Sequence, residues 1–181
     1  MAQNYFETLM VGGEVISFTH LEPFQFSVNT QQRPGGARID VRFSNHCFSE
    51  AYQPTRHQGA VTDIWDRGQR RVFSPARYDL SLGLRAIIEA LPSSPIYLTP
   101  EANFVRIMRA GSNGPDEYRV YFNARRGAAE HGCDVLLFVE SAYAREAGKA
   151  MLGPAQLTKV RFALLVDKII RGEKLRFHHK K

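Results

Sequence analysis

Residues 38–44 alternate between charged and apolar side chains, and a period of two is the pattern of a half-buried β-strand. One face carries Ile39, Val41 and Phe43, and the other carries Arg38, Asp40 and Arg42. The pattern therefore predicts a sheet that is packed on one side and faces water or a ligand on the other. Aromatic and β-branched residues at 15–20 and 24–29 predict two more strands, so residues 1–73 form a strand-rich region.

A hairpin and the main helix follow. Residues 62–73 predict two short strands joined by a turn at Asp66-Arg67-Gly68, where glycine accepts the backbone conformation of a tight turn. Residues 75–91 predict a helix, with Ser74 as its N-cap and Pro75 at the first helical position. Its apolar residues recur at helical spacing: Leu80, Leu84, Ile87, Ile88 and Leu91. Pro92 ends this helix, whose apolar stripe predicts packing against a sheet.

Three strand-like segments joined by glycine-bearing loops predict an antiparallel meander over residues 104–143. In its second segment the alternation places Tyr118, Val120 and Phe122 on one face and Arg119 and Tyr121 on the other. The C-terminal element at 159–177 is compatible with either helix or strand. As a strand, residues 159–167 align their apolar side chains on one face, whereas a helix scatters them around its axis. We therefore predict a strand, followed by a turn back at 171–173.

These elements predict one α+β domain over residues 1–181, with mostly antiparallel sheets packed on the helix at 75–91. A chain of 181 residues buries enough surface to fold without a disulfide or a metal, so we expect Cys47 and Cys133 to be reduced thiols. No signal-peptide pattern and no long apolar run is present, and we predict a cytoplasmic protein without a membrane segment.

Arginine dominates the basic residues, with 18 Arg against 6 Lys and a formal net charge of +6. The planar guanidinium group forms paired hydrogen bonds to phosphate and stacks on aromatic bases. This excess indicates RNA, DNA or another polyanion as the partner. The alternative is a GC-rich genome that favours arginine codons, in which case the charges form only a solvated surface.

Arginine and tyrosine side chains of the meander form the candidate nucleic-acid-binding site. We expect Arg106, Arg119 and Tyr121 to meet on one face of the sheet, beside Phe104 and Met108. Such a surface can bind phosphates and stack bases. Four further residues extend it along the next loop and the last strand: Arg125, Arg126, Tyr143 and Arg145. The alternative is an ordinary solvent-exposed sheet face, where Arg and Tyr are common.

The order of one helix followed by three antiparallel strands with Arg and Tyr on one face resembles the layout of RelE/ParE-type toxins. The resemblance covers about Ser74 to Arg145 and rests on element order and residue type. It implies metal-independent cleavage of messenger RNA, in which basic and aromatic side chains stabilise charge on the transferred phosphate. Arg106, Arg119 and Tyr121, with His131 or Tyr143, would take those roles.

The sequence gives little support for a metal site, a reactive cysteine or a known catalytic motif. The neighbours His46 and Cys47 suggest a thiolate–imidazolium pair or a zinc site, but adjacent strand residues point to opposite faces. Their spacing to His57, Asp63 and Asp66 matches no recurring zinc pattern, so we predict a buried Cys47, no metal and no cofactor. Motifs for nucleotide hydrolysis, dinucleotide binding and serine hydrolysis are missing from the sequence, and we assign no catalytic residue.

Three functions therefore remain. The first is a binding protein for nucleic acid or another polyanion that uses the Arg/Tyr sheet face. The second is an adaptor or inhibitor that binds another protein, for which 12 Phe and 7 Tyr supply aromatic surface. The third is the metal-independent ribonuclease. Exposed sheet edges would also allow a homodimer.

Overall fold

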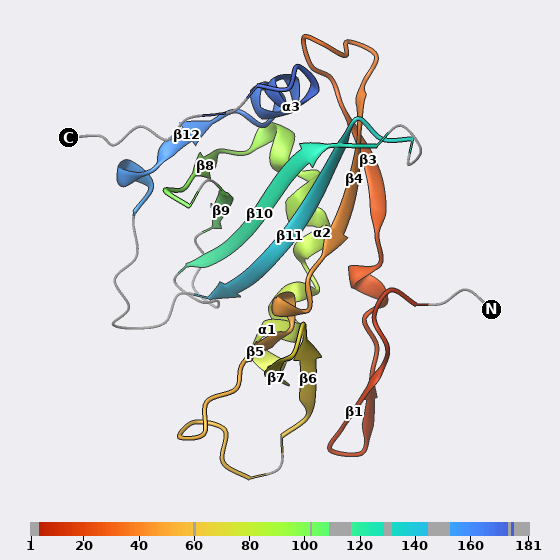
Figure 1. The fold of residues 1–181 in the computed structure, drawn as a ribbon, viewed down its shortest axis with the longest axis vertical. Helices are drawn as coiled ribbons and strands as arrows, with labels where there is room; N and C mark the ends of the chain where they lie inside the picture. Colours follow the sequence, from red (N-terminus) through yellow and green to blue (C-terminus); the bar gives the residue numbers. More distant parts are fainter. Residues whose placement is uncertain are drawn as a thin grey trace.

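A seven-stranded sheet forms the centre of the fold in the computed structural model (Figure 1). The structure describes residues 4–59, 61–101, 103–108, 117–128, 132–144, 153–173 and 175. The sheet has the order β12-β8-β9-β10-β11-β4-β3, and its one parallel pair is β4 with β11. The strands are β3 (Phe24–Val28), β4 (Ala37–Phe43), β8 (Ile96–Leu98), β9 (Phe104–Met108), β10 (Tyr118–Arg126), β11 (Val135–Ala144) and β12 (Thr158–Val160). The α+β class and the antiparallel meander β9-β10-β11 are confirmed; β8 was not predicted.

Helices lie on one face of this sheet (Figure 1). They are α1 (Pro75–Ser81), α2 (Leu84–Glu89) and α3 (Phe162–Ile170), and short 3₁₀ turns occur at η1 (Thr19–Leu21), η2 (Asn45–Cys47), η3 (Leu91–Ser93) and η5 (Pro154–Gln156). The single helix predicted at 75–91 is therefore interrupted. The Ser81 hydroxyl donates to the Tyr78 carbonyl at 2.6 Å, a local bond that bends helices, and Gly83 follows as a weak helix former.

The main hydrophobic core lies between these helices and the inner face of the sheet. Phe43, Phe122, Leu84 and Ile88 are fully buried there. Phe104 stacks on Phe122 with ring centroids 5.7 Å apart, so aromatic contacts reinforce the packing. The face of β10 that carries Tyr118, Val120 and Phe122 is the buried one, as the alternation of the sequence predicts.

A second sheet of three strands projects from the lower end of the large one in Figure 1. It has the order β5-β7-β6, with β5 (Ser49–Ala51), β6 (Asp63–Asp66) and β7 (Gln69–Phe73). The predicted hairpin is confirmed: Asp66 pairs with Gln69 across a two-residue turn. Arg67 and Gly68 in that turn have φ of 49° and 82°, which is the left-handed backbone that matches the twist of a hairpin.

A third unit is the hairpin of β1 (Leu9–Val11) and β2 (Glu14–Ile16). The strand predicted at 15–20 is shorter than expected, because the chain turns into η1 at Thr19. The turn is closed by a backbone hydrogen bond from Leu21 to Phe18 at 2.8 Å. Phe18 is buried and stacks on Phe48 with a centroid separation of 4.0 Å, which ties this region to the core.

The strand predicted at 159–167 is wrong beyond its first residues, because β12 ends at Val160 and α3 begins at Phe162. The buried positions of α3 include Phe162, Leu165 and Val166, a helical spacing, while Leu164 faces outward. The sequence alone did not reveal that Leu164 is exposed, and this exposure is what allows the segment to be a helix. None of the helices formed by the described residues has the length and apolar character needed to cross a membrane.

Two adjacent leucines test the helical assignment of α3. Leu165 is 3% exposed and Leu164 is 39% exposed. We expect Leu165→Ala to lower the free energy of unfolding by about 2–5 kcal/mol, because it leaves a cavity in the core. Leu164→Ala, the matched control, should change it by about 0.5 kcal/mol or less. Urea unfolding followed by circular dichroism measures both values, and equal losses would contradict the helix.

Candidate nucleic-acid interface

The face of the sheet opposite the helices is hollowed along β4, β10 and β11. Register places Arg42 of β4 beside Phe138 of β11, and Phe138 beside Asn123 of β10. These three side chains form one row across the open face. The hollow has a volume of about 420 Å³, and its lining residues are Tyr5, Arg42, Arg67, Asn123, Arg125, Leu136, Phe138 and Glu140.

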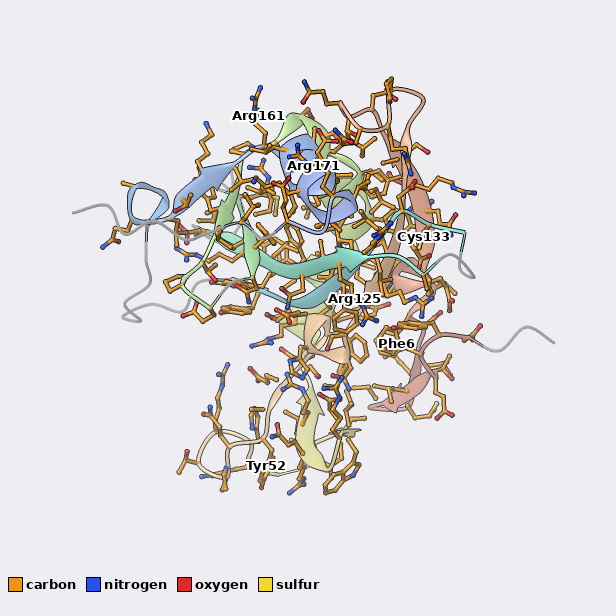
Figure 2. All side chains as sticks on the ribbon, turned by 45° about the horizontal axis from the view of Figure 1, so that its top comes forward. Phe6, Tyr52, Arg125, Cys133, Arg161 and Arg171 are labelled. Atoms are coloured by element: carbon orange, nitrogen blue, oxygen red, sulfur yellow. The ribbon has the colours of Figure 1, made fainter. Side chains whose placement is uncertain are left out.

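A second hollow of about 320 Å³ continues the first one. The two share Arg67, Phe138 and Glu140, and the second adds Phe6, His46 and Asp66 among its lining residues. We call the two hollows together the sheet-face groove. Arg125 comes from the sheet and Phe6 from the N-terminal segment, and Figure 2 labels both. The groove is thus enclosed by the sheet, the N-terminal segment and the β6–β7 turn.

Positive charge in the sheet-face groove is only partly compensated. The Arg42 Nε atom lies 3.0 Å from Asp40 Oδ2, so this guanidinium is paired. Arg67 and Arg125 are exposed, and neither forms an ion pair with any residue that the structure describes. These two guanidinium groups are therefore available to an anion from outside the chain.

Glu140 is the acidic residue on the floor of the groove. It is the extra residue of a β-bulge, since Tyr121 pairs with Ser141 and Phe122 with Val139. Its carboxylate oxygens accept hydrogen bonds from Asn123 Nδ2 at 2.6 Å and from Asn103 Nδ2 at 3.0 Å. Two amides therefore hold the Glu140 carboxylate in a fixed orientation.

His46 joins the large sheet to the second sheet at one end of the groove. Its Nε2 atom lies 2.9 Å from Asp66 Oδ2, next to the β6–β7 turn. Burial lowers the pKa of His46, and the hydrogen bond to Asp66 opposes that shift. The neighbouring Cys47 is fully buried, and burial raises the pKa of its thiol to about 12. Cys47 is thus a buried apolar residue, as predicted.

His57 is held by two partners in a fixed tautomer. The backbone N–H of Gln53 donates to His57 Nδ1 at 2.8 Å, and His57 Nε2 lies 3.0 Å from Glu50 Oε1. A ring that accepts at Nδ1 carries its proton at Nε2, so it donates to Glu50. Among the residues that the structure describes, no group of three or more His, Cys, Asp or Glu side chains is placed to hold a metal ion.

The residues predicted from the sequence that the structure describes lie in different parts of the fold. Arg106 pairs with Val120, whose side chain is in the core, so it lies on the opposite face from Arg119 and Tyr121. The expected meeting of these three residues is therefore wrong, because the register of β9 and β10 could not be read from the sequence. Arg106 Nη1 instead donates to the Pro95 carbonyl at 3.2 Å. Arg145 lies outside the described residues.

Arg119, Tyr121 and Tyr143 do share one face, but they form an internal network. Arg119 is 3% exposed and donates to the Glu117 carboxylate. Tyr121 stacks on Tyr143 with centroids 5.6 Å apart, and burial raises the pKa of Tyr143 to about 12. Arg119 is therefore turned toward a carboxylate inside the protein and is not exposed to a substrate phosphate in this structure. His131 lies outside the described residues.

Arg77 continues this network from α1. Its guanidinium carbon lies 5.1 Å from the centre of the Tyr143 ring, and its Nη1 atom donates to the carbonyls of His46 at 3.2 Å and Ser49 at 2.9 Å. An arginine near the positive end of a helix is locally unfavourable. Here it crosslinks α1, η2 and β5, which explains its position.

Arg125 and Arg126 lie at the far end of β10, and Arg125 belongs to the sheet-face groove. Apart from Arg125, the lining residues of the first hollow were not predicted from the sequence, and they include Tyr5, Arg42, Arg67 and Phe138. Arg42 could have been found from the sequence, because the alternation at 38–44 places it on the polar face of the strand. Phe138 stands in the apolar run 135–139, which predicts burial on both faces and hides an open one.

A family model matches residues 7–170, which is most of the chain, and the protein therefore belongs to the YjaZ family. No curated protein and no solved structure matches the chain.

The lowered pKa of His46 gives a pH dependence of stability. The folded state favours the neutral ring, so the unfolded chain binds more protons as the pH falls through about 6.5. We expect stability to be full above that pH and to decrease below it. His46→Asn should weaken the decrease, measured as the urea midpoint between about pH 7.5 and pH 5.5. Burial also lowers the pKa of His20, which supplies remaining dependence. Stability that instead rises toward acid pH would contradict this assignment.

Proposed function

We propose that this protein binds nucleic acid through the sheet-face groove. The observation that carries the proposal is the pair of exposed guanidinium groups, Arg67 and Arg125, that face the same hollow without a carboxylate partner among the described residues. They come from the β6–β7 turn and from β10, which are far apart in the sequence. Phosphate oxygens are the natural ligands of such paired guanidinium groups.

Aromatic side chains in the groove favour nucleic acid over a simple anion. Phe138 is half-buried on the floor, and Tyr5 lies on the wall. Aromatic rings beside a basic groove stack bases, and this stacking tolerates any base sequence. Asn123 adds an amide that can hydrogen-bond a base edge or a phosphate.

The overall charge supports the same proposal. A formal net charge of +6 attracts a polyanion over long range and speeds association. We place the activity in the cytoplasm, because Cys47 and Cys133 are both free and buried, which suits a reducing compartment.

Removal of a groove arginine tests the proposal. We expect Arg67→Ala and Arg125→Ala each to weaken binding of a fluorescein-labelled oligonucleotide roughly ten-fold, because each removes a charged hydrogen-bond donor to phosphate. Each variant should also lower the slope of log affinity against log salt by about one. Fluorescence anisotropy from low to moderate salt measures both quantities.

Arg161→Ala is the matched control, since it removes the same charge from an exposed residue. Figure 2 places Arg161 beside α3, on the far side of the sheet from Arg125. Its affinity and salt slope should stay close to those of the unchanged protein. Equal weakening by all three variants would indicate a diffuse charge effect, and no binding at low salt would remove the proposal.

A protein-interaction module is the second candidate. Met10 and Val15 are directly paired across the β1–β2 hairpin and are 60% and 65% exposed. An exposed apolar pair on a projecting hairpin is a common anchor for another protein.

The double variant Met10→Ser/Val15→Ser tests this second candidate. It should fold normally, because both side chains are exposed, and it should keep its affinity for oligonucleotides. A pull-down with each form as bait should recover a protein partner only with the unchanged chain. Identical recovery with both forms would exclude this hairpin as the interface.

A further inference from the structure

A row of planar side chains crosses the second sheet on one face. Trp65 of β6 pairs directly with Arg70 of β7. On the other side of Arg70, the backbone N–H of Tyr52 donates to the Arg70 carbonyl at 3.3 Å, which aligns Tyr52 with the same position. We call Trp65, Arg70 and Tyr52 the hairpin row. Figure 2 labels Tyr52 on this projecting sheet.

Within the hairpin row, the Arg70 guanidinium stacks on the Tyr52 ring. The Arg70 guanidinium carbon lies 3.8 Å from the centre of the Tyr52 ring, and Arg70 Nε donates to Asp63 Oδ1 at 2.9 Å. On its far side, Tyr52 stacks on His57 with centroids 5.7 Å apart. Asp63 therefore helps to hold the Arg70 guanidinium over the Tyr52 ring.

Trp65 contributes little to the packing of this sheet. It is 65% exposed, whereas its neighbour Ile64 points to the other face and packs against the core. An indole ring exposed to this extent is unusual in a folded domain. Its position at the open end of a row of stacked planar groups therefore indicates a ligand with a planar face.

The hairpin row lies next to the sheet-face groove. Arg67, which lines the groove, belongs to the two-residue turn that joins the strands of Trp65 and Arg70. Asp66 lines the groove, so its neighbour Trp65 points to the opposite face of β6, and a nucleic-acid chain that contacts Arg67 reaches Trp65 by turning around the end of this hairpin. The groove and the row can therefore contact successive parts of one strand.

We propose that Trp65, at the open end of the hairpin row, stacks on an unpaired base of a single-stranded nucleic acid whose phosphates occupy the sheet-face groove. This inference rests on the proposed function and adds the substrate class. In a duplex the bases are already stacked and paired, so their faces are not available to a side chain. Single strands offer free base faces, and base–aromatic stacking is how many proteins bind them without sequence preference.

Trp65 provides a direct readout because it is the only tryptophan of the chain. Its fluorescence should be strongly quenched by oligothymidylate of about 15 nucleotides, a length within the usual site sizes for single-strand binding. The same sugar–phosphate chain with abasic positions should bind with little quenching. A duplex of equal length should quench little. Quenching by the abasic chain as strong as by oligothymidylate would overturn base stacking.

Substitution separates stacking from folding. Trp65→Ala should weaken binding of the labelled oligothymidylate about ten-fold or more, and Trp65→Phe should retain most of the affinity because a ring remains. Leu82→Ala is the matched control, since Leu82 is also apolar and 55% exposed. Its affinity should be unchanged. Equal affinities of Trp65→Ala and the unchanged protein would also overturn the inference.

Failure of the inference and failure of the proposed function give different results. If anisotropy detects binding that depends on Arg67 and Arg125 while Trp65 stays unquenched, the groove binds nucleic acid and the hairpin row does not. If a duplex binds and quenches as well as oligothymidylate, the single-strand class is wrong. If no oligonucleotide binds at low salt, the proposed function itself is wrong.

Discussion

The parallel pairing of β4 with β11 is the contact on which the rest of the architecture depends. It joins a strand from the first quarter of the chain to the last strand of the meander and so makes one continuous sheet. Asp134 fixes where the pairing starts: its backbone N–H donates to the Arg38 carbonyl at 2.9 Å, and its carboxylate accepts from the Arg38 N–H at 2.8 Å. This register sets Arg42 beside Phe138 and thereby creates the floor of the sheet-face groove. A shift by one residue would bury Arg42 and expose Val41.

The groove exists because three separate units meet at this sheet. The N-terminal segment brings Tyr5, the meander brings Arg125, and the β6–β7 turn brings Arg67. The bond between His46 and Asp66 holds the turn against the large sheet. The backbone of Arg67 is in the left-handed region, which is uncommon for a residue other than glycine. The tight two-residue turn imposes this conformation. The turn therefore fixes the direction in which this guanidinium leaves the backbone.

The arginines of this chain include two groups with different roles. Arg71, Arg77 and Arg119 are bonded to carbonyls, hydroxyls or a carboxylate inside the protein, where the forked guanidinium satisfies several acceptors at once. Arg67 and Arg125 are exposed, without a carboxylate partner among the described residues. A count of arginines alone cannot separate the two groups, so the overall basic charge overstates the surface available to a polyanion.

The sequence by itself determined the local elements: the strand at 38–44 from its alternation, the hairpin turn at Arg67-Gly68, the N-terminus of the helical region at Pro75, and the buried face of β10. Each of these depends on neighbours within a few residues, where periodicity and turn chemistry act. Only the tertiary structure decided which strands pair and in which register. The register of β9 and β10 places Arg106 on the opposite face from Arg119. The segment after β12 is the helix α3, because the core covers Leu165 but not Leu164. The candidate site depends on such long-range pairing, since its side chains come from segments that no local pattern connects.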